Sequence, residues 1–575
     1  MLKVSVVIPV YNPGAYLHAC VKSLLGQTMP ADEFEVVFVD DGSTDESPAY
    51  LDTLAAEHPH LKVIHQENSG WPGQPRNVGI AASSGEYVFF LDHDDWFAPE
   101  ALERLYDFAV DCGSDVVLPK MGGLGRPVPH HVFAETVPSV RLKDDPVIDS
   151  LTPHKLFRRE FLDRHQLRFP EGRRRLEDHL FVVACYLRAE TISIYASYTC
   201  YVHIRRQDSA NAGFRRIDWA SYFDNLAEAL DEVIAHTEPG PLRSSLFRRW
   251  LQVEMVNRLS GERRLRLDDD EAVELFNHAH RIAAAYFDES VVELMFPASQ
   301  LVGRAIIAGE ADEVRRLAEQ TARWAVYPLL LQAGWVNGVL QISGTVELSD
   351  EPPPEPDHQL AGLARARRRA WAEGRVDELP EYPSPLSVEQ RFIALFGDTD
   401  PWLIAEGFAF SSVGIAVTAR RTGARWSVPA AVRRSGLTAS FTADLDVPTL
   451  AAGERLAKGL WDLDVHFGVL GVSQHRHLRL VPERQPGEVM PEPTEEGRAP
   501  KFAAYFSQET RVLCLDVGLV KHKELRRKKP PPVIPVPEPV PPPVVEPVAK
   551  GTPKAKEPVT LSRRAVRKLR RTLSR

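Results

Sequence analysis

Four short apolar runs in the first 91 positions constrain the fold more than any other feature of this sequence. They are Val4–Val10, Phe34–Val39, Lys62–His65 and Tyr87–Leu91. The segments between them carry apolar residues at helical spacing, so strand and helix alternate along the chain. Runs rich in Val, Ile and Phe are typical of strands that are covered on both faces. The sequence therefore predicts an α/β domain with a mostly parallel, Rossmann-like sheet.

Two helix starts are expected in this region. Asn12 followed by Pro13 matches an N-cap with proline at the first helical position. Pro99 precedes Leu102 and Leu105, which would lie on one face of a second helix.

Polar residues follow each predicted strand. Asp40 and Asp41 follow the second strand, and Asp92, Asp94 and Asp95 follow the fourth. Ligands of open parallel sheets bind at the carboxyl ends of the strands, so these side chains should meet at one edge. Two aspartate clusters would repel each other there unless a cation or a polar ligand lies among them. The Asp-x-Asp spacing suits a divalent ion with oxygen ligands, although an acidic turn before the helix at Pro99 would look the same.

Four motifs in residues 1–120 resemble those of family 2 glycosyltransferases with the GT-A fold. They are Val-Ser-Val-Val-Ile-Pro-Val-Tyr-Asn, Val-Asp-Asp-Gly-Ser-Thr-Asp, Gly-x-x-x-x-x-Arg-Asn-x-Gly and Gly-Glu-Tyr-Val-Phe-Phe-Leu-Asp-x-Asp-Asp. A looser likeness continues through Lys155–Arg159 and Glu177–His179. The resemblance implies an inverting transfer of a sugar from a nucleotide-sugar donor.

The resemblance also implies roles for individual residues. In similar proteins the positions of Pro9 and Tyr11 pack on uracil, Asp41 accepts a hydrogen bond from the uracil imide, Asn68 and Arg76 lie near uracil and diphosphate, Asp92 meets ribose or sugar, and Asp94 holds Mn²⁺ or Mg²⁺. An aromatic wall, a carboxylate that reads an N–H and a bidentate arginine each suit that chemistry. Two alternatives stay open, because Tyr11 could be a core residue and His203 could be either a further metal ligand or a structural histidine.

The pair Glu177-Asp178 is the candidate for the general base. It precedes the apolar run Leu180–Leu187 and so should lie in the first turn of a helix. Neighbouring helical residues point about 100° apart, so only one of the two can face the sugar. The family has its base in this pair, and we assign Asp178 as base and Glu177 as a positioning residue. Acidic charge that merely stabilises a helix N-terminus is the alternative.

A narrower resemblance is to the β-glycosyltransferases that decorate wall teichoic acid in Gram-positive bacteria. Arg126, Arg205 and Ser209 match positions that contact the donor diphosphate in those enzymes. The resemblance implies a UDP-sugar donor, carrying N-acetylglucosamine or a related hexose, and an anionic wall polymer or another glycan as acceptor.

Composition divides the chain into four expected parts. Residues 1–212 form the catalytic domain and 213–325 a helical linker. Residues 326–520 form a β-rich, sandwich-like domain that is a candidate for glycan binding or homo-oligomerisation. Residues 521–575 are a Pro-rich spacer and basic tail, which we expect to be disordered. The tail holds sixteen Lys and Arg against four Glu, whereas the whole chain has a net charge of −10, so the rest carries −22.

These properties favour a cytoplasmic enzyme. The sequence has no apolar run long enough to cross a membrane, and its five cysteines lack disulfide or metal-ligand spacing. The basic tail predicts peripheral contact with an anionic membrane or polymer rather than with nucleic acid. Two other functions compete: a capsule or exopolysaccharide transferase with a lipid-linked acceptor, and a non-catalytic polymer-binding protein with a decayed transferase domain.

Overall fold

The computed structural model describes most of residues 2–526. Its gaps are residues 125, 127, 207–216, 296, 323–324, 350–409, 422–424, 436–437, 452–454, 470–471, 479–484, 486, 495–499 and 510. Ser209 and the predicted Pro-rich basic tail from Arg527 onward lie outside the described residues. No helix in the described part of the chain is long and apolar enough to cross a membrane.

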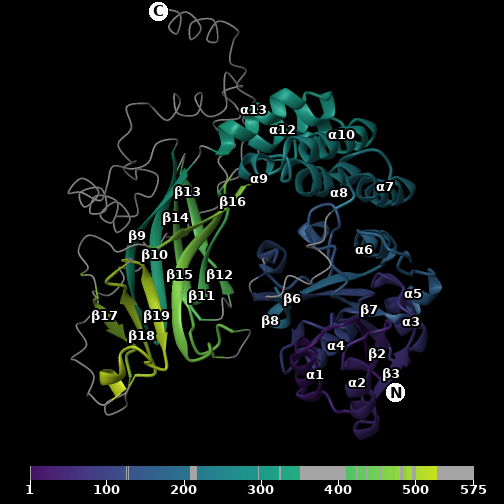
Figure 1. The fold of residues 1–575 in the computed structure, drawn as a ribbon, viewed down its shortest axis with the longest axis horizontal. Helices are drawn as coiled ribbons and strands as arrows, with labels where there is room; N and C mark the ends of the chain where they lie inside the picture. The colour runs from purple at the N-terminus through teal and green to yellow at the C-terminus, as the bar shows by residue number, and fades with distance from the viewer. Residues whose placement is uncertain are drawn as a thin grey trace, which may run out of the picture. The chain divides into compact units, whose positions relative to one another are not determined.

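The first part of the chain folds around a mixed sheet, which the described residues build from eight strands in the order β3-β2-β1-β4-β7-β6-β8-β5 (Figure 1). The strands are β1 Val4–Val10, β2 Phe34–Asp40, β3 Leu61–His65, β4 Tyr87–Phe90, β5 Trp96–Phe97, β6 Val116–Leu124, β7 Leu156–Arg158 and β8 Ile192–Ile204. The pairs β1–β2, β2–β3, β1–β4 and β6–β8 are parallel. Strand β7 runs antiparallel to β4 and β6, and β5 antiparallel to β8. The predicted GT-A-like α/β fold is confirmed.

Helices cover this sheet between the strands. They are α1 Tyr16–Leu25, α2 Ser47–Glu57, α3 Gly73–Ala82, α4 Ala101–Cys112, α5 Arg159–Arg164 and α6 Glu177–Arg188, with 3-10 turns η1 His130–Phe133 and η2 Pro146–Asp149. Helix α3 packs on β1 and β2, and α4 on β6 and β8. Helix α4 begins two residues after Pro99 and ends at Cys112, and the next residue, Gly113, caps it in the left-handed conformation with a φ of +64°.

The helix start predicted at Asn12 is wrong. Helix α1 begins at Tyr16, and Asn12 itself has a φ of +46°. Its side-chain oxygen accepts the backbone N–H of Thr44 at 2.8 Å and that of Asp45 at 3.3 Å. Asn12 therefore ties the end of β1 to the loop after β2 instead of capping a helix, a use that its short polar side chain permits in the left-handed region.

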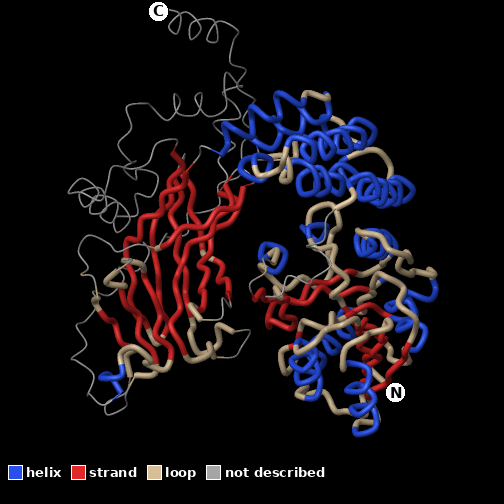
Figure 2. The backbone as a smooth tube through the Cα atoms, in the orientation of Figure 1, coloured by secondary structure: helices blue, strands red, loops and turns tan. Residues whose placement is uncertain are grey.

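Helices alone fill the next part of the described chain, as predicted (Figure 2). They are α7 Trp219–His236, α8 Pro241–Trp250, the π-helix η4 Leu251–Val256, α9 Gly261–Leu265, α10 Asp269–Tyr286, α11 Glu289–Val292, α12 Pro297–Ala308 and α13 Ala311–Ala322. Asp218 caps α7 by accepting the N–H of Ala220 and Ser221, and Asp268 caps α10 through Glu271. Helix α7 packs against α6, so the helices share one apolar core with the first sheet.

Two antiparallel sheets follow. Their strands are β9 Ala325–Val336, β10 Val339–Ser349, β11 Phe410–Ala419, β12 Arg425–Pro429, β13 Ala431–Ser435, β14 Thr438–Leu445, β15 Gly459–Val469, β16 Val472–His477, β17 Val489–Pro491, β18 Phe502–Phe506 and β19 Leu513–Val517, with a 3-10 turn η6 at Lys523–Arg526. Among the described residues one sheet has the order β13-β14-β10-β9 and the other β12-β11-β15-β19-β18-β17 with β16 beside β15. Buried side chains of both sheets, such as Phe441 and Val465, form one cluster. The predicted sandwich-like domain is confirmed.

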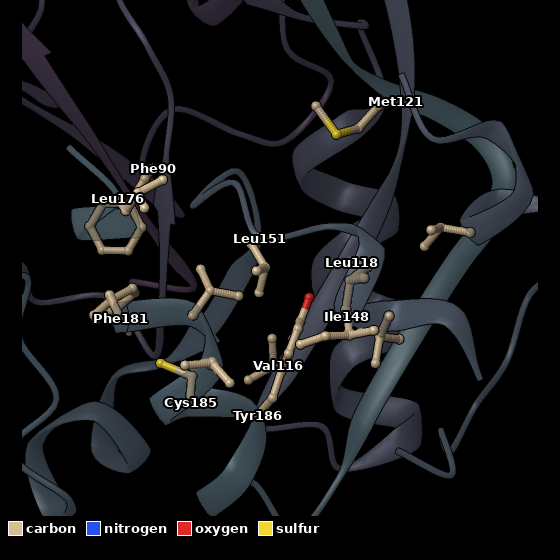
Figure 3. Close-up of a cluster of buried hydrophobic side chains, with 14 of the residues drawn as sticks. Phe90, Val116, Leu118, Met121, Ile148, Leu151, Leu176, Phe181, Cys185 and Tyr186 are labelled. Atoms are coloured by element: carbon tan, nitrogen blue, oxygen red, sulfur yellow. The ribbon is translucent and has the colours of Figure 1, made fainter. Parts of the chain in front are cut away.

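The core of the first sheet supports the entry to α6. Figure 3 shows Phe90 from the end of β4 beside Leu176 and Phe181. The Phe90 and Phe181 rings lie 5.8 Å apart, and Phe181 stacks on Phe169 at 3.8 Å. Leu176 immediately precedes α6 with a φ of +63°, which is uncommon for a leucine. Burial of its side chain holds this turn, and the turn determines where α6 begins.

Candidate active site

Asp41, directly after β2, accepts hydrogen bonds from three residues of the loop that follows β3. Its carboxylate accepts hydrogen bonds from the Gln66 side chain at 2.6 Å and from the N–H and hydroxyl of Ser69 at 3.0 and 2.9 Å. The Asn68 side chain donates to the Asp41 carbonyl at 2.8 Å. Gly42 has a φ of +72°, and a Cβ there would lie 2.8 Å from the Asn68 nitrogen. The loops after β2 and β3 therefore need glycine at position 42 in order to meet.

The residue directly after β1, Tyr11, has a solvent-exposed aromatic side chain. Tyr11 is 41% exposed, so the alternative that it is a core residue is wrong. Pro9 is buried in β1, and its carbonyl oxygen lies 3.0 Å from Nδ1 of His93. Tyr11 is therefore available as a flat wall at the same sheet edge as Asp41.

Arg76 of α3 connects two carboxylates that come from different elements. It is only 4% exposed, donates to Asp92 at 2.9 Å and to Glu177 at 3.2 Å, and lies over the Phe169 ring at 5.2 Å. Burial opposes ionisation of Asp92, but His154 and Arg76 outweigh it and hold the pKa of Asp92 well below its usual range. Arg76 was expected near a diphosphate. That role stays a prediction, because in this structure its guanidinium contacts carboxylates.

The aspartates after β4 form a compact cluster. Carboxylate oxygens of Asp92, Asp94 and Asp95 lie within 4.8 Å of one another. Burial raises the pKa of Asp94, and the charge of Asp92 adds to the effect. Burial and its two acidic neighbours also raise the pKa of Asp95, which accepts hydrogen bonds from the Tyr201 hydroxyl and from the Ile204 N–H. Raised pKa values in a crowded set of hard oxygen donors fit a site for a divalent cation such as Mn²⁺ or Mg²⁺.

Two buried histidines adjoin this cluster. His154 stacks on Tyr201 at 4.4 Å, and His203 has Nε2 3.8 Å from Asp95. Ligand atoms of Asp95, His154 and His203 also lie within 4.8 Å of one another. Burial lowers the pKa of both histidines, that of His154 to about 4, so both rings are neutral at pH 7 and able to ligate a metal. His203 thus keeps both interpretations, as metal ligand or as structural residue.

Helix α6 presents the acidic pair as predicted for its first turn. Glu177 is 6% exposed and accepts from the Trp71 indole at 2.7 Å as well as from Arg76. Asp178 is partly exposed, and its Oδ1 accepts the N–H of His179 at 2.9 Å. Burial raises the pKa of Asp178, which makes it a better proton acceptor. Glu177 is therefore engaged within the protein, whereas Asp178 is the more accessible member of the pair.

Arg126 and Arg205 are exposed near the ends of β6 and β8. The Arg205 N–H donates to the Leu124 carbonyl at 2.9 Å, so the two arginines lie at the same end of the β6–β8 ladder. Ser209, the third residue predicted with them, lies outside the described residues. Sequence reasoning missed Arg206, which is buried against the Tyr16 ring at 4.7 Å and favours ionised Asp94. It also missed His154, for which the only signal was its place just before the Lys155 motif.

Comparisons with known proteins agree with this architecture. Residues 5–162 match the family model described as glycosyl transferase family 2, and residues 220–318 match the glycosyl transferase TarS linker domain. A poly(ribitol-phosphate) beta-glucosyltransferase of Bacillus spizizenii is 41% identical over 207 residues, which cover 36% of this chain and 33% of that protein. The chain thus aligns with about a third of the length of this relative and of the poly(ribitol-phosphate) beta-N-acetylglucosaminyltransferase TarS of Staphylococcus aureus.

Solved structures extend the likeness. The crystal structure of TarS 1-349 of Staphylococcus aureus in complex with UDP-GlcNAc has a TM-score of 0.51 at 28% identity, covering 59% of this chain and 96% of that one. Another crystal structure of the same organism's TarS covers 91% of this chain and 86% of that one, with a TM-score of 0.50. Its identity of 21% means that this likeness concerns the fold alone.

The expected resemblance to family 2 and to the wall teichoic acid enzymes is therefore confirmed. Strands β2 to β7 and the acidic strand ends lie within the first matched segment and helices α8 to α12 within the second, whereas α6 and β8 lie between the two segments. Residues 5–162 of this chain thus form a glycosyl transferase family 2 domain, which a linker domain of the TarS kind follows.

Proposed function

We propose that this chain is an inverting, metal-dependent glycosyltransferase that moves a hexose from a UDP-sugar to a hydroxyl of a wall polymer of the poly(ribitol phosphate) type. One observation carries the proposal. Arg76 joins Asp92, in the aspartate cluster, to Glu177, beside the candidate base. A candidate cation site and a candidate base are thereby held together across 85 positions of sequence, as a displacement at one carbon requires.

The donor would lie along the edge where β1, β2 and β4 end. Asp41 and Asn68 would read the uracil, and Tyr11 with Pro9 would provide its wall. Arg126, Arg205 and Ser209 would bind the diphosphate. The mutual hydrogen bonds of the Asp41 and Asn68 loops support this assignment, because a preorganised loop loses little entropy when the donor binds.

The aspartate cluster would hold the cation, with Asp94 as the principal ligand. When bound, Mn²⁺ or Mg²⁺ neutralises charge on the departing diphosphate. The crowding of the Asp92, Asp94 and Asp95 carboxylates supports such a site, and so do the raised pKa values of the buried Asp94 and Asp95, because a bound cation would offset their mutual repulsion.

Asp178 would act on the acceptor. Its carboxylate takes the proton of an acceptor hydroxyl while the hydroxyl oxygen attacks the anomeric carbon of the donor. The new C–O bond forms on the face opposite the leaving group, the bond to UDP breaks, and the configuration inverts. Glu177, held by Trp71 and Arg76, would keep the first turn of α6 in place during this step.

The acceptor and the sugar rest on what the relatives are named for. One relative is a poly(ribitol-phosphate) beta-glucosyltransferase, and the TarS structure holds UDP-GlcNAc. We propose a cytoplasmic enzyme that reaches a membrane-borne or polymeric acceptor with the help of its basic tail. A lipid-linked acceptor is the second candidate, and it is favoured only by the charge of that tail.

The proposal is tested by measuring UDP release from UDP-GlcNAc and UDP-glucose with and without poly(ribitol phosphate). Each reaction is run with Mn²⁺, with Mg²⁺ and with excess chelator. We expect release that depends on both the polymer and the metal, and a sugar-bearing polymer as product. Polymer-independent release with no sugar transferred would contradict the acceptor, and full transfer in chelator would contradict the metal.

A further inference from the structure

Helix α6, which carries the candidate base Asp178, is attached to the linker helices at both of its ends. Arg174, three residues before the helix, pairs with Glu228 of α7 at 2.8 Å. Arg188, the last residue of α6, pairs with Glu232 one turn further along α7. The two helices also pack against each other. The position of α6 therefore depends on the linker as well as on the first sheet.

His179, in the first turn of α6, accepts a hydrogen bond from the linker. Trp250, the last residue of α8, directs its indole N–H to Nδ1 of His179 at 3.4 Å. The Trp250 side chain is fully buried and His179 is nearly so, and neither group can therefore turn to bulk water if the other is lost. Burial lowers the pKa of His179 to about 4, so the ring is neutral at pH 7 and Nδ1 can accept a hydrogen bond from the indole.

The same histidine orients the carboxylate of Asp178. The His179 backbone N–H donates to Oδ1 of Asp178 at 2.9 Å. The two neighbours of Asp178 are held by different domains, Glu177 by the first domain and His179 by Trp250 of the linker. Because Asp178 lies between them in the chain, a shift of either neighbour would move its carboxylate relative to the donor edge.

A buried ionic network fixes the segment that carries Trp250. Its neighbour Arg249 pairs with Glu254 at 2.5 Å, and Arg258 pairs with the same carboxylate at 2.9 Å. The Tyr222 hydroxyl of α7 also donates to Glu254. Glu254 lies in the π-helix η4, which begins directly after Trp250, and π-helical turns are frequent at functional sites. The indole is therefore carried by a firmly anchored segment and can position a partner without itself being ordered.

We propose that Trp250 is a positioning residue for the transfer reaction, acting through His179 on the carboxylate of Asp178. The inference rests on the proposed function, since it assumes that Asp178 is the base. The rate depends steeply on the geometry between a base and the hydroxyl that it deprotonates, and a displacement of about 1 Å can lower it about a hundredfold. The linker domain thus supplies one of the contacts that arrange the active site and is not only a spacer.

Trp250→Phe tests this role, because it removes the indole N–H and keeps an aromatic ring in the core. We expect kcat for transfer to poly(ribitol phosphate) to fall by at least about tenfold, with little change in the KM for the UDP-sugar or in calorimetric UDP affinity. Trp219→Phe is the matched control. Trp219 is another buried indole of the linker, but its N–H has no hydrogen-bond partner in the described part of the chain. This variant should keep the wild-type kcat.

His179 provides a second, independent pair of variants. An asparagine side chain places an oxygen acceptor near the position of Nδ1, whereas leucine cannot accept a hydrogen bond. His179→Asn should therefore keep most of the wild-type kcat, and His179→Leu should lose as much as Trp250→Phe does. The double variant Trp250→Phe/His179→Leu should lose no more kcat than either single variant, because both substitutions break the same contact. Thermal unfolding of each variant shows that the assayed protein is folded.

A wild-type kcat in Trp250→Phe would overturn the inference, and so would an equal loss of kcat in Trp219→Phe. If Trp250→Phe does not fold, the two His179 variants decide, and equal kcat values for asparagine and leucine would overturn the inference as well. Full activity of Asp178→Asn would instead overturn the assignment of the base. A wild type that transfers no sugar to the polymer would overturn the proposed function.

Discussion

Nη2 of Arg76 lies 2.9 Å from Oδ1 of Asp92, and the same guanidinium reaches Glu177 through Nη1. Arg76 and Glu177 side chains are almost entirely buried, whereas Asp92 keeps some exposure. The Arg76 guanidinium therefore forms ion pairs with one carboxylate from the end of β4 and another from the start of α6. Neither carboxylate would be well balanced without it, because buried charges are stable only when they are paired.

Arg76→Met should destabilise the fold and abolish transfer. It would leave Glu177 buried without its cation, and breaking a buried pair in this way costs about 3 kcal/mol or more. Denaturant unfolding gives the loss of stability. Arg104→Met removes a half-exposed pair with Glu100 and should cost much less. Equal stability of the two variants would show that the Arg76 bridge contributes little.

Asp94→Asn should abolish transfer and weaken Mn²⁺ binding. Calorimetric titration of Mn²⁺ into the apo-protein provides a readout that does not depend on activity. Asp224→Asn changes an exposed carboxylate on α7 and serves as the control. If Asp94→Asn binds Mn²⁺ as tightly as the control does, the cation is held elsewhere.

Asp178→Asn should lower kcat by at least about a hundredfold with little effect on the donor KM, the scale expected for loss of a general base. Transfer requires the ionised carboxylate, and burial raises the pKa of Asp178. Activity of the wild type should therefore fall, as pH decreases, at a higher pH than for an exposed aspartate. The asparagine variant should lack this acid limb.

Glu177→Gln is the matched comparison for that experiment. It should lower thermal stability, since Arg76 and Trp71 lose a charged partner, while retaining the acid limb of the pH profile. An active Asp178→Asn together with an inactive Glu177→Gln would mean that the two roles are reversed.

Glu254 in the π-helix should contribute strongly to the stability of the fold, although it has no part in the proposed donor site. It pairs with Arg249 at 2.5 Å and with Arg258 at 2.9 Å, and these two arginines hold the pKa of Glu254 well below its usual range despite its burial. Glu254→Gln should destabilise the protein by about 3 kcal/mol. Glu262→Gln, in an exposed pair with Arg266, should cost under about 1 kcal/mol.

The pH dependence of unfolding tests the charge of Glu254. The stability that a depressed carboxyl pKa contributes is present above the unfolded pKa and is lost as pH falls through the folded one. Wild type should therefore lose stability in acid more steeply than Glu254→Gln does. Parallel pH curves for the two proteins would contradict the charge assignment.

Deleting residues 530–575 should leave donor hydrolysis unchanged and reduce binding to anionic vesicles and to a long anionic acceptor. Each Lys or Arg near such a surface contributes about 1 kcal/mol, and a tethered basic segment raises the local concentration of a polyvalent acceptor. The loss should be larger at low salt than at high salt. Equal vesicle binding and equal acceptor KM at low salt would leave the tail without this role.

The four strands β1 to β4 and their alternation with helices could be predicted from local periodicity, whereas β5 and β6 were not predicted. Strands such as β1 are continuous apolar runs because both faces are covered, and that signal lies within a few adjacent residues. The acidic strand ends and the start of α6 at Glu177 could be predicted for the same reason. The helix start predicted at Asn12 was wrong. The Asn12 side chain accepts a hydrogen bond from a loop more than thirty positions away and does not cap the adjacent helix.

Only the tertiary structure decided which charges meet. Arg76 contacts carboxylates 16 and 101 positions away, and His154 reaches Asp92 from the loop before β7. Arg175 likewise lies over the ring of Trp71, which is more than a hundred positions away in the sequence. Such contacts depend on how strands pair and helices pack, and no residue type or spacing along the chain encodes them. The sequence by itself determined the elements and the chemistry that each carries, while packing determined which of those groups share one site.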